Sequence, residues 1–267
     1  MGTEVLYQQD GAIGCITFDS PDGINLISTP VMAALEAKLE EIKRQPDVRV
    51  LILTGEGRTF IAGADIREMN DAPGDFGKSF SQRGQQCMNK LARFEHAVTI
   101  AAINGPALGG GCELALACDL RVMAEEATIG FPEVKLGLIP GWGGTQRAFA
   151  LMGPSKARRM VFVGEPLTGE VAAKTELVNE CVPNNELTDR VNALAKRIIA
   201  NGPAAVRLAK RVMSATEESW LDHGMHAEAE AFGKAFLNEE GREGLRAFLQ
   251  KRPPSWIDAE SELQPQT

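Results

Sequence analysis

Two glutamates twenty residues apart are the side chains of this sequence best suited to chemistry. Glu113 closes the stretch Gly109-Gly-Gly-Cys-Glu113, and Glu133 closes Gly130-Phe-Pro-Glu133. Glycine lets a ligand oxygen approach the backbone closely. A pair of carboxylates near free backbone N–H groups can move a proton while those N–H groups hold an oxyanion. The pair therefore predicts proton transfer next to a carbonyl group.

The sequence around Glu113 predicts a helix start. A buried strand ends at Ile103, a turn follows, and three glycines precede a helix-forming stretch. Helix starts leave unpaired N–H groups and a positive dipole end, which favours an ionised carboxylate and hence a general base. The alternative is a glycine-rich loop that only packs a helix on a sheet, with Glu113 in solvent. A dinucleotide site is disfavoured because Gly-x-Gly-x-x-Gly is absent, and no Walker lysine follows.

Glu133 has different surroundings. Pro132 suits a first helical position and places Glu133 just inside a short turn. The flanking residues Ile129, Phe131 and Leu136 are apolar. Desolvation in such a niche raises the pKa of a carboxyl group, so we expect Glu133 to keep a proton for donation.

A further segment, residues 58–69, follows a predicted strand. Its Ala62-Gly-Ala64 run is small enough to expose another backbone N–H group. Asp65 is expected to cap a helix that begins at Ile66.

The elements that position these residues indicate a layered α/β core. Around Asp10-Gly11, residues 3–9 and 12–18 form a predicted hairpin, and strands are predicted at 48–54, 98–103 and 119–123. Helices are predicted at 30–44, with Thr29 as its N-cap, and at 79–93. After Pro183 strand signals stop, and amphipathic helices are predicted at 186–200, 203–216, 218–237 and 239–250. We therefore divide the chain into a core, residues 1–200, and a helical docking or oligomer-forming module, residues 201–267.

Composition excludes several classes of protein. A formal net charge of -8 argues against a nucleic-acid-binding surface, and 44% hydrophobic residues suffice for a buried core. The N-terminus lacks the regions of a secretory signal, and no uncharged run is long enough to span a membrane, so we expect a cytoplasmic protein. The five scattered cysteines indicate buried thiols, and the three histidines give no metal-ligand pattern.

Taken together and in this order, the motifs resemble those of the crotonase (enoyl-CoA hydratase/isomerase) superfamily over nearly the whole chain. The matching motifs are Phe60-Ile-Ala-Gly-Ala-Asp-Ile66, Asn104-Gly-Pro-Ala-Leu-Gly-Gly-Gly-Cys-Glu-Leu-Ala115, Cys118-Asp-Leu-Arg121, Phe131-Pro-Glu-Val-Lys-Leu-Gly137, Pro140-Gly-Trp-Gly-Gly-Thr-Gln-Arg147 and Glu243-Gly-Leu-Arg-Ala-Phe-Leu-Gln-Lys-Arg-Pro-Pro254. The resemblance implies a spiral of repeated ββα units with a helical C-terminal oligomerisation module. It also implies a homotrimer or homohexamer.

The resemblance further implies an oxyanion hole made by the backbone N–H groups of Ala64 and Gly110, which would hold the thioester carbonyl oxygen of an acyl-CoA. Members with glutamate at both matching positions look like hydratases, so Glu113 and Glu133 favour hydration of a 2-enoyl-CoA. Glu113 would then deprotonate the attacking water, and Glu133 would protonate the α-carbon. CoA would arrive as part of the substrate, without a metal or redox cofactor, and fatty acid metabolism is the implied setting.

The resemblance also suggests where CoA binds. The implied contacts lie at Ala62, Ala64, Asp65, Ile66, Arg67 and Gly110, and at Phe232 and Lys251, in a C-terminal region that reaches the CoA of a neighbouring subunit. From the residues alone, a packed Phe232 and a solvated Lys251 are the alternatives.

Two segments depart from the family pattern. The stretch around Asn25 replaces the usual Asn-Ala-Leu, and Trp142 fills a variable position. The Trp142 ring either reshapes the acyl pocket or simply packs, and Cys112 is expected to pack rather than react. Rival functions are an enoyl-CoA isomerase, a cyclic dienoyl-CoA hydratase, or a non-catalytic CoA- or RNA-binding paralogue.

Overall fold

The computed structural model describes residues 2–70 and 72–256, with the backbone alone described for 217–220. Its larger sheet has the strand order β1-β2-β3-β4-β6-β9, and its smaller sheet has the order β5-β7-β8. The strands are β1 (Glu4–Asp10), β2 (Ile13–Asp19), β3 (Val50–Gly55), β4 (Val98–Ile103), β5 (Ala107–Leu108), β6 (Leu120–Ala124), β7 (Thr128–Gly130), β8 (Leu167–Thr168) and β9 (Glu180–Val182).

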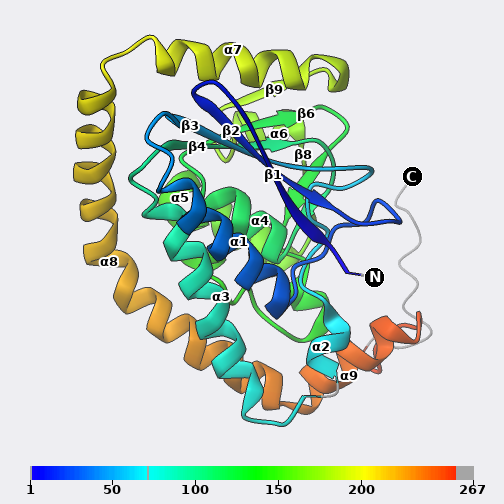
Figure 1. The fold of residues 1–267 in the computed structure, drawn as a ribbon. Coiled ribbons are helices and arrows are strands. Elements are labelled where there is room, and N and C mark those ends of the chain that lie inside the picture. The colour runs from blue at the N-terminus through cyan, green and yellow to red at the C-terminus, as the bar shows by residue number, and fades with distance from the viewer. Residues whose placement is uncertain (1, 71, 257–267) are drawn as a thin grey trace.

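Helices pack around these sheets, and the last helix, α9, ends at Leu249 (Figure 1). They are α1 (Thr29–Ile42), α2 (Ile66–Asn70), α3 (Phe76–Ala92), α4 (Gly110–Leu116), α5 (Gly144–Val163), α6 (Gly169–Lys174), α7 (Leu187–Ile199), α8 (Pro203–Leu237) and α9 (Glu239–Leu249). Two short 3-10 helices, η1 (Glu133–Leu136) and η2 (Asn184–Glu186), complete the order.

The strand pairing follows from the sequence pattern. β1 and β2 form the predicted antiparallel hairpin through a turn in which Gly11 has φ +55°. β3 and β4 are nearly continuous apolar runs and pair in parallel, as expected for central strands covered on both faces. The predicted hairpin and the predicted strands at 48–54, 98–103 and 119–123 are confirmed within one or two residues.

A repeated unit builds the core. β4 leads through β5 into α4, and β6 leads through β7 into η1. Each pair consists of one strand of the larger sheet and one strand of the smaller sheet. The predicted α/β spiral is thus confirmed, and its turns deliver Glu113 and Glu133 from successive units.

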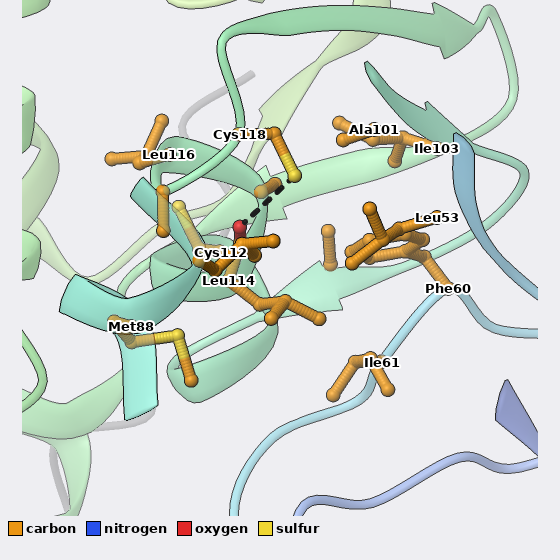
Figure 2. Packing of buried hydrophobic residues seen from close by; sticks show 14 of the residues in the cluster. Leu53, Phe60, Ile61, Met88, Ala101, Ile103, Cys112, Leu114, Leu116 and Cys118 are labelled. Carbon is orange, nitrogen blue, oxygen red and sulfur yellow. Dashed lines mark hydrogen bonds between the residues drawn. The ribbon is translucent and has the colours of Figure 1, made fainter. Parts of the chain in front are cut away.

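The core lies between the large sheet and the helices. Figure 2 shows part of this core, in which Leu114 and Leu116 of α4 and Ala101 and Ile103 of β4 belong to one cluster of buried residues. The Cys118 Sγ donates to the Leu114 carbonyl oxygen at 3.6 Å. All five cysteines are free thiols; Cys87, Cys112 and Cys118 are buried as expected, whereas Cys15 and Cys181 are only partly buried.

The C-terminal helices differ from the prediction at one point. The two helices predicted at 203–216 and 218–237 form the single helix α8, because residues 214–221 contain neither glycine nor proline. A Cβ at Gly224 would lie 1.9 Å from the Gln146 Oε1 atom, so this glycine lets α8 pass close to the start of α5. In Figure 1, α8 runs along one side of the molecule, and α9 lies beside α2.

The start of α1 is a smaller correction. Ser28, and not Thr29, is the N-cap residue, and its side chain makes no capping hydrogen bond. The Thr29 N–H group donates instead to the Glu68 Oε2 atom of α2 at 2.9 Å. Within residues 2–70 and 72–256, every helix is too short or too polar to cross a bilayer.

Candidate active site

Ala64 and Gly110 are brought together by a short parallel pairing. Ile61 and Ala107 form a parallel bridge, and the Leu108 N–H group donates to the Ile61 carbonyl oxygen at 3.0 Å. Ala64 and Gly110 each lie three residues beyond this bridge, so the two segments carry them to neighbouring positions. The sequence alone did not show that Ile61 pairs with Ala107, because these residues belong to two motifs that lie far apart in the chain.

The backbone N–H groups at these positions are available as donors. Ile27 bridges Ala64 through the Gly63 carbonyl and the Asp65 N–H group, which directs the N–H of Ala64 away from that partner. Gly110 is the first residue of α4, where an N–H group has no acceptor within the helix. Among the residues that the structure describes, neither N–H group has a backbone acceptor, as the predicted oxyanion hole requires.

Glu113 lies in the first turn of α4, as predicted, and is buried. Its Oε1 atom accepts hydrogen bonds from the N–H groups of Trp142 at 2.6 Å and Gly144 at 2.8 Å. The donors that orient this carboxylate thus come from the start of α5. A Cβ at Gly144 would lie 2.8 Å from the same oxygen, so only glycine leaves room for it.

The folded chain adds influences on the ionisation of Glu113 that oppose the expected effect of the helix dipole. Burial raises the pKa of Glu113 well above its ordinary value, and the carboxylates of Glu228 and Glu133 raise it further. The two hydrogen bonds from α5 oppose this shift. The dipole of α4 was the only influence visible in the sequence, whereas burial and neighbouring carboxylates dominate in the folded chain.

Glu133 occupies the apolar niche that the sequence predicted. Pro132 is the N-cap residue of η1, one position earlier than expected, and Glu133 begins the helix. A Cβ at Gly109 would lie 3.0 Å from the Glu133 Oε1 atom, so the carboxyl group lies directly beside the glycine that precedes α4. Its Oε2 atom is buried without a hydrogen-bond partner in the described part of the chain.

Burial, together with the Glu228 carboxylate, raises the pKa of Glu133 to about 8. The expected direction of the shift is thus confirmed, and the carboxyl group holds its proton at neutral pH.

A third buried carboxylate, Glu228 of α8, was missed in the sequence. Its side chain accepts from the Gly143 N–H group at 2.6 Å and the Thr145 N–H group at 3.0 Å. The sequence does contain a pattern that could have revealed Glu228, because apolar residues recur at helical spacing on both sides of it. Leu221, Met225 and Phe232 share one buried face of α8 with Glu228, and a glutamate within an apolar stripe requires partners.

The segment expected to bind CoA lies at the start of α2. Asp65 Oδ1 accepts from the Arg67 N–H group at 3.1 Å, which is the predicted capping interaction. The Arg67 guanidinium also pairs with Asp65, and its side chain is 72% exposed. Ala62 and Ile66 are partly buried on either side of the Ala64 N–H group. Binding of CoA at this segment stays a prediction.

The two C-terminal residues have separate surroundings. Phe232 is buried, and a Cβ at Gly141 would lie 2.5 Å from its ring, so it packs against the turn before α5 in its own chain. Lys251 is exposed just after α9, with φ +53°. Neither is brought next to Glu113 by the described contacts, and their binding of CoA in a neighbouring subunit stays a prediction.

The Trp142 ring is buried between glycines. A Cβ at Gly84 would lie 2.1 Å from this ring, and one at Gly110 would lie 2.2 Å from it. Phe80 packs on the ring with centroids 5.4 Å apart at 59°. Trp142 therefore packs in the interior, which was one of the two expected alternatives, and its ring lies against Gly110, a residue of the predicted oxyanion hole. Cys112 is buried, and burial raises the pKa of its thiol, which agrees with a packing role.

Comparison with known proteins relates this geometry to a family. Residues 8–259 match the family model described as enoyl-CoA hydratase/isomerase. The chain belongs to this family. A short-chain-enoyl-CoA hydratase of Clostridium acetobutylicum is 35% identical over 93% of this chain and 95% of its own. A crotonyl-CoA hydratase of Syntrophomonas wolfei is 35% identical over 95% of this chain and 97% of its own.

Comparison with solved structures shows that the fold is also similar to that of enoyl-CoA hydratases. The crystal structure of an enoyl-CoA hydratase from Bacillus anthracis has a TM-score of 0.76 to this enoyl-CoA hydratase/isomerase family member at 34% identity, covering 95% of this chain and 98% of the other. The predicted family and the crotonase fold are therefore confirmed.

Proposed function

We propose that this family member is an enoyl-CoA hydratase, a hydro-lyase that adds water across the 2,3 double bond of a 2-enoyl-CoA and yields a 3-hydroxyacyl-CoA. The observation that carries the proposal is a pair of carboxyl groups at the start of α4: Glu113 is buried in its first turn, and Glu133, whose Oε2 atom is buried, lies beside Gly109 just before it. The names of the relatives at about 35% identity support the same activity.

The first step is addition of water. The N–H groups of Ala64 and Gly110 donate hydrogen bonds to the thioester oxygen and stabilise the negative charge that develops on it, which makes the β-carbon electrophilic. Each such donor lowers the barrier by about 3 kcal/mol. The Glu113 carboxylate removes one proton from water while the water oxygen forms its bond to the β-carbon. The electron pair of the double bond moves into the enolate.

The second step is protonation. The enolate electron pair forms a bond between the α-carbon and the proton of the Glu133 carboxyl group, and the thioester carbonyl is restored. Glu133, with a pKa of about 8, carries that proton at neutral pH. Glu113 ends protonated and Glu133 ionised, so one proton must return between them before the next turnover. Because buried neighbouring carboxyl groups titrate together, the roles belong to the pair as a unit.

CoA enters this reaction as part of the substrate, and the steps above require no metal or redox group. We propose that its phosphate-bearing portion lies near Arg67, an exposed residue in the first turn of α2. Assembly into a trimer or hexamer is supported by exposed apolar side chains. These are Leu208, Val212 and Met213 on α8 and Phe162 at the end of α5.

The test is an assay with crotonyl-CoA that follows the loss of the conjugated thioester absorbance. We expect hydration, and no comparable isomerisation of a 3-enoyl-CoA. Isomerisation without hydration would instead assign the chain to another branch of the family. Binding of CoA without either reaction would indicate a non-catalytic paralogue.

A further inference from the structure

The turn that enters α5 offers four consecutive backbone N–H groups, and two glutamates share them alternately. Glu113 accepts from Trp142 and Gly144, whereas Glu228 accepts from Gly143 and Thr145. These four distances lie between 2.6 and 3.0 Å. The turn is therefore held on one side by a residue of α4 and on the other by a residue of α8.

The backbone of the turn is suited to this sharing. Gly143 has φ +102°, a region that side-chain-bearing residues rarely adopt. A Cβ at Gly143 would lie 2.3 Å from the Arg147 Nη1 atom and 2.5 Å from the Met225 Cε atom. Glycine is needed here because the chain must turn its N–H groups toward two different carboxylates within one tight space.

Glu228 is itself fixed by further donors. The Gln85 Nε2 atom donates to its Oε1 atom at 3.2 Å and to the Met225 carbonyl oxygen at 2.8 Å. The Thr145 hydroxyl group also donates to the Glu228 Oε2 atom. Both carboxylate oxygens thus accept two hydrogen bonds each, so the side chain is locked in a single orientation.

We propose that Glu228 is a positioning residue of the hydration reaction, which holds the Trp142–Thr145 turn so that Trp142 and Gly144 aim the Glu113 carboxylate at the attacking water. Glu228 acts through the backbone and does not exchange a proton with the substrate. This role rests on the proposed hydratase function.

The charged groups around Glu228 allow its positioning role to be tested by a second measurement, the pH profile of the reaction. The elements packed against it present Glu113 from α4, Glu133 from η1 and Arg147 from α5, while α3 presents the neutral Gln85. The negative charge of Glu228 raises the pKa of both Glu113 and Glu133. Removal of that charge must therefore move the pH profile of the reaction to lower pH.

The test uses E228Q in the full chain, assayed with crotonyl-CoA. A glutamine places an NH2 group where one carboxylate oxygen accepts two donors, so part of the turn loses its acceptor. We expect kcat to fall about 10- to 100-fold, the scale of a small misplacement of a catalytic group, with little change in KM. Both limbs of the kcat–pH profile are expected to move to lower pH.

Two further variants separate positioning from folding. E230Q changes an exposed glutamate of the same helix that pairs with Lys78, and it should keep wild-type kcat and pH profile. E228D keeps the charge but withdraws the carboxylate by one methylene, so kcat should fall without the shift of the profile. E228D also carries the test if E228Q does not fold.

Wild-type kcat in a folded E228Q or E228D would overturn the positioning role. A lower melting temperature in these variants with unchanged kcat and pH profile would show a purely structural role and overturn it as well. A wild-type chain that does not hydrate crotonyl-CoA would overturn the proposed function and this role together, which distinguishes the two failures.

Discussion

Among the side chains of α8 that the structure describes, Lys210 and Glu228 are charged and buried, and they are stabilised in opposite ways. Lys210, near its start, is 6% exposed and pairs with Asp119 at 2.7 Å, while it also donates to the Ala97 carbonyl oxygen at 2.9 Å. Glu228, five turns further along, accepts from amide and hydroxyl groups and faces two more carboxylates.

The pairing of Lys210 with Asp119 is typical of a structural site, whereas the grouping of Glu228 with two other carboxyl groups is typical of a catalytic site. A buried ion pair offsets its own desolvation, and removal of either member leaves an uncompensated charge. Buried carboxyl groups beside one another lack that compensation, so their pKa values are raised, and Glu133, with a pKa of about 8, keeps a proton that it can transfer. The first arrangement ties α8 to the sheet, and the second prepares the active site.

The largest effect should come from the carboxyl groups that touch the substrate. E113Q and E133Q are each expected to lower kcat about 100- to 10,000-fold, the usual contribution of general acid–base catalysis. Glutamine preserves the shape of the side chain, so binding of CoA, measured by calorimetry, should be largely unchanged. E170Q, on the surface, serves as the matched control. Near wild-type hydration by both variants would contradict the site.

Breaking the ion pair should affect stability and leave catalysis intact. K210M leaves the Asp119 carboxylate partly buried without its cation, which is expected to cost about 3 to 5 kcal/mol in the free energy of unfolding. Denaturant unfolding measures this loss, and kcat per folded molecule should stay near wild type. K174M, in an exposed pair with Glu170, should unfold as the wild type does. A stable K210M would remove the contrast between the two sites.

The pH dependence of stability should distinguish the active site from the ion pair. The pKa of Glu133 is raised from 4.5 to about 8 in the folded chain, so the folded state binds more protons within this window. The free energy of unfolding contributed by Glu133 therefore falls as pH rises through it.

E133Q lacks this dependence. Its stability relative to the wild type should increase between about pH 5 and about pH 9, by at least about 1.4 kcal/mol, the equivalent of one pKa unit. Unfolding curves at both pH values provide the measurement. An equal difference at the two values would mean that Glu133 titrates normally.

The smallest effect should appear at the edge of the ion pair. Thr99 donates its backbone N–H group to Asp119 Oδ2 at 2.7 Å, and its hydroxyl group interacts with the same residue. T99V removes only the hydroxyl interactions, so we expect a loss of about 1 kcal/mol in stability and no change in kcat. T99S, which keeps the hydroxyl group, is the control. A loss as large as that of K210M would show that the pair depends mainly on Thr99.

The sequence by itself determined the local elements and the type of chemistry. Alternating apolar runs defined the strands, glycines beside Glu113 and apolar neighbours beside Glu133 predicted their surroundings, and the motifs identified the family. These features are readable because each depends on residues close together in the chain.

The tertiary structure alone decided how the site works. The register of Ile61 on Ala107 placed two N–H groups together, and the turn before α5 supplied the donors for Glu113. Glu228 lies 115 positions from Glu113 in the chain and reaches the same turn only because α8 packs over α5. The raised pKa values have the same origin, since burial and the approach of distant carboxylates arise only when the chain has folded.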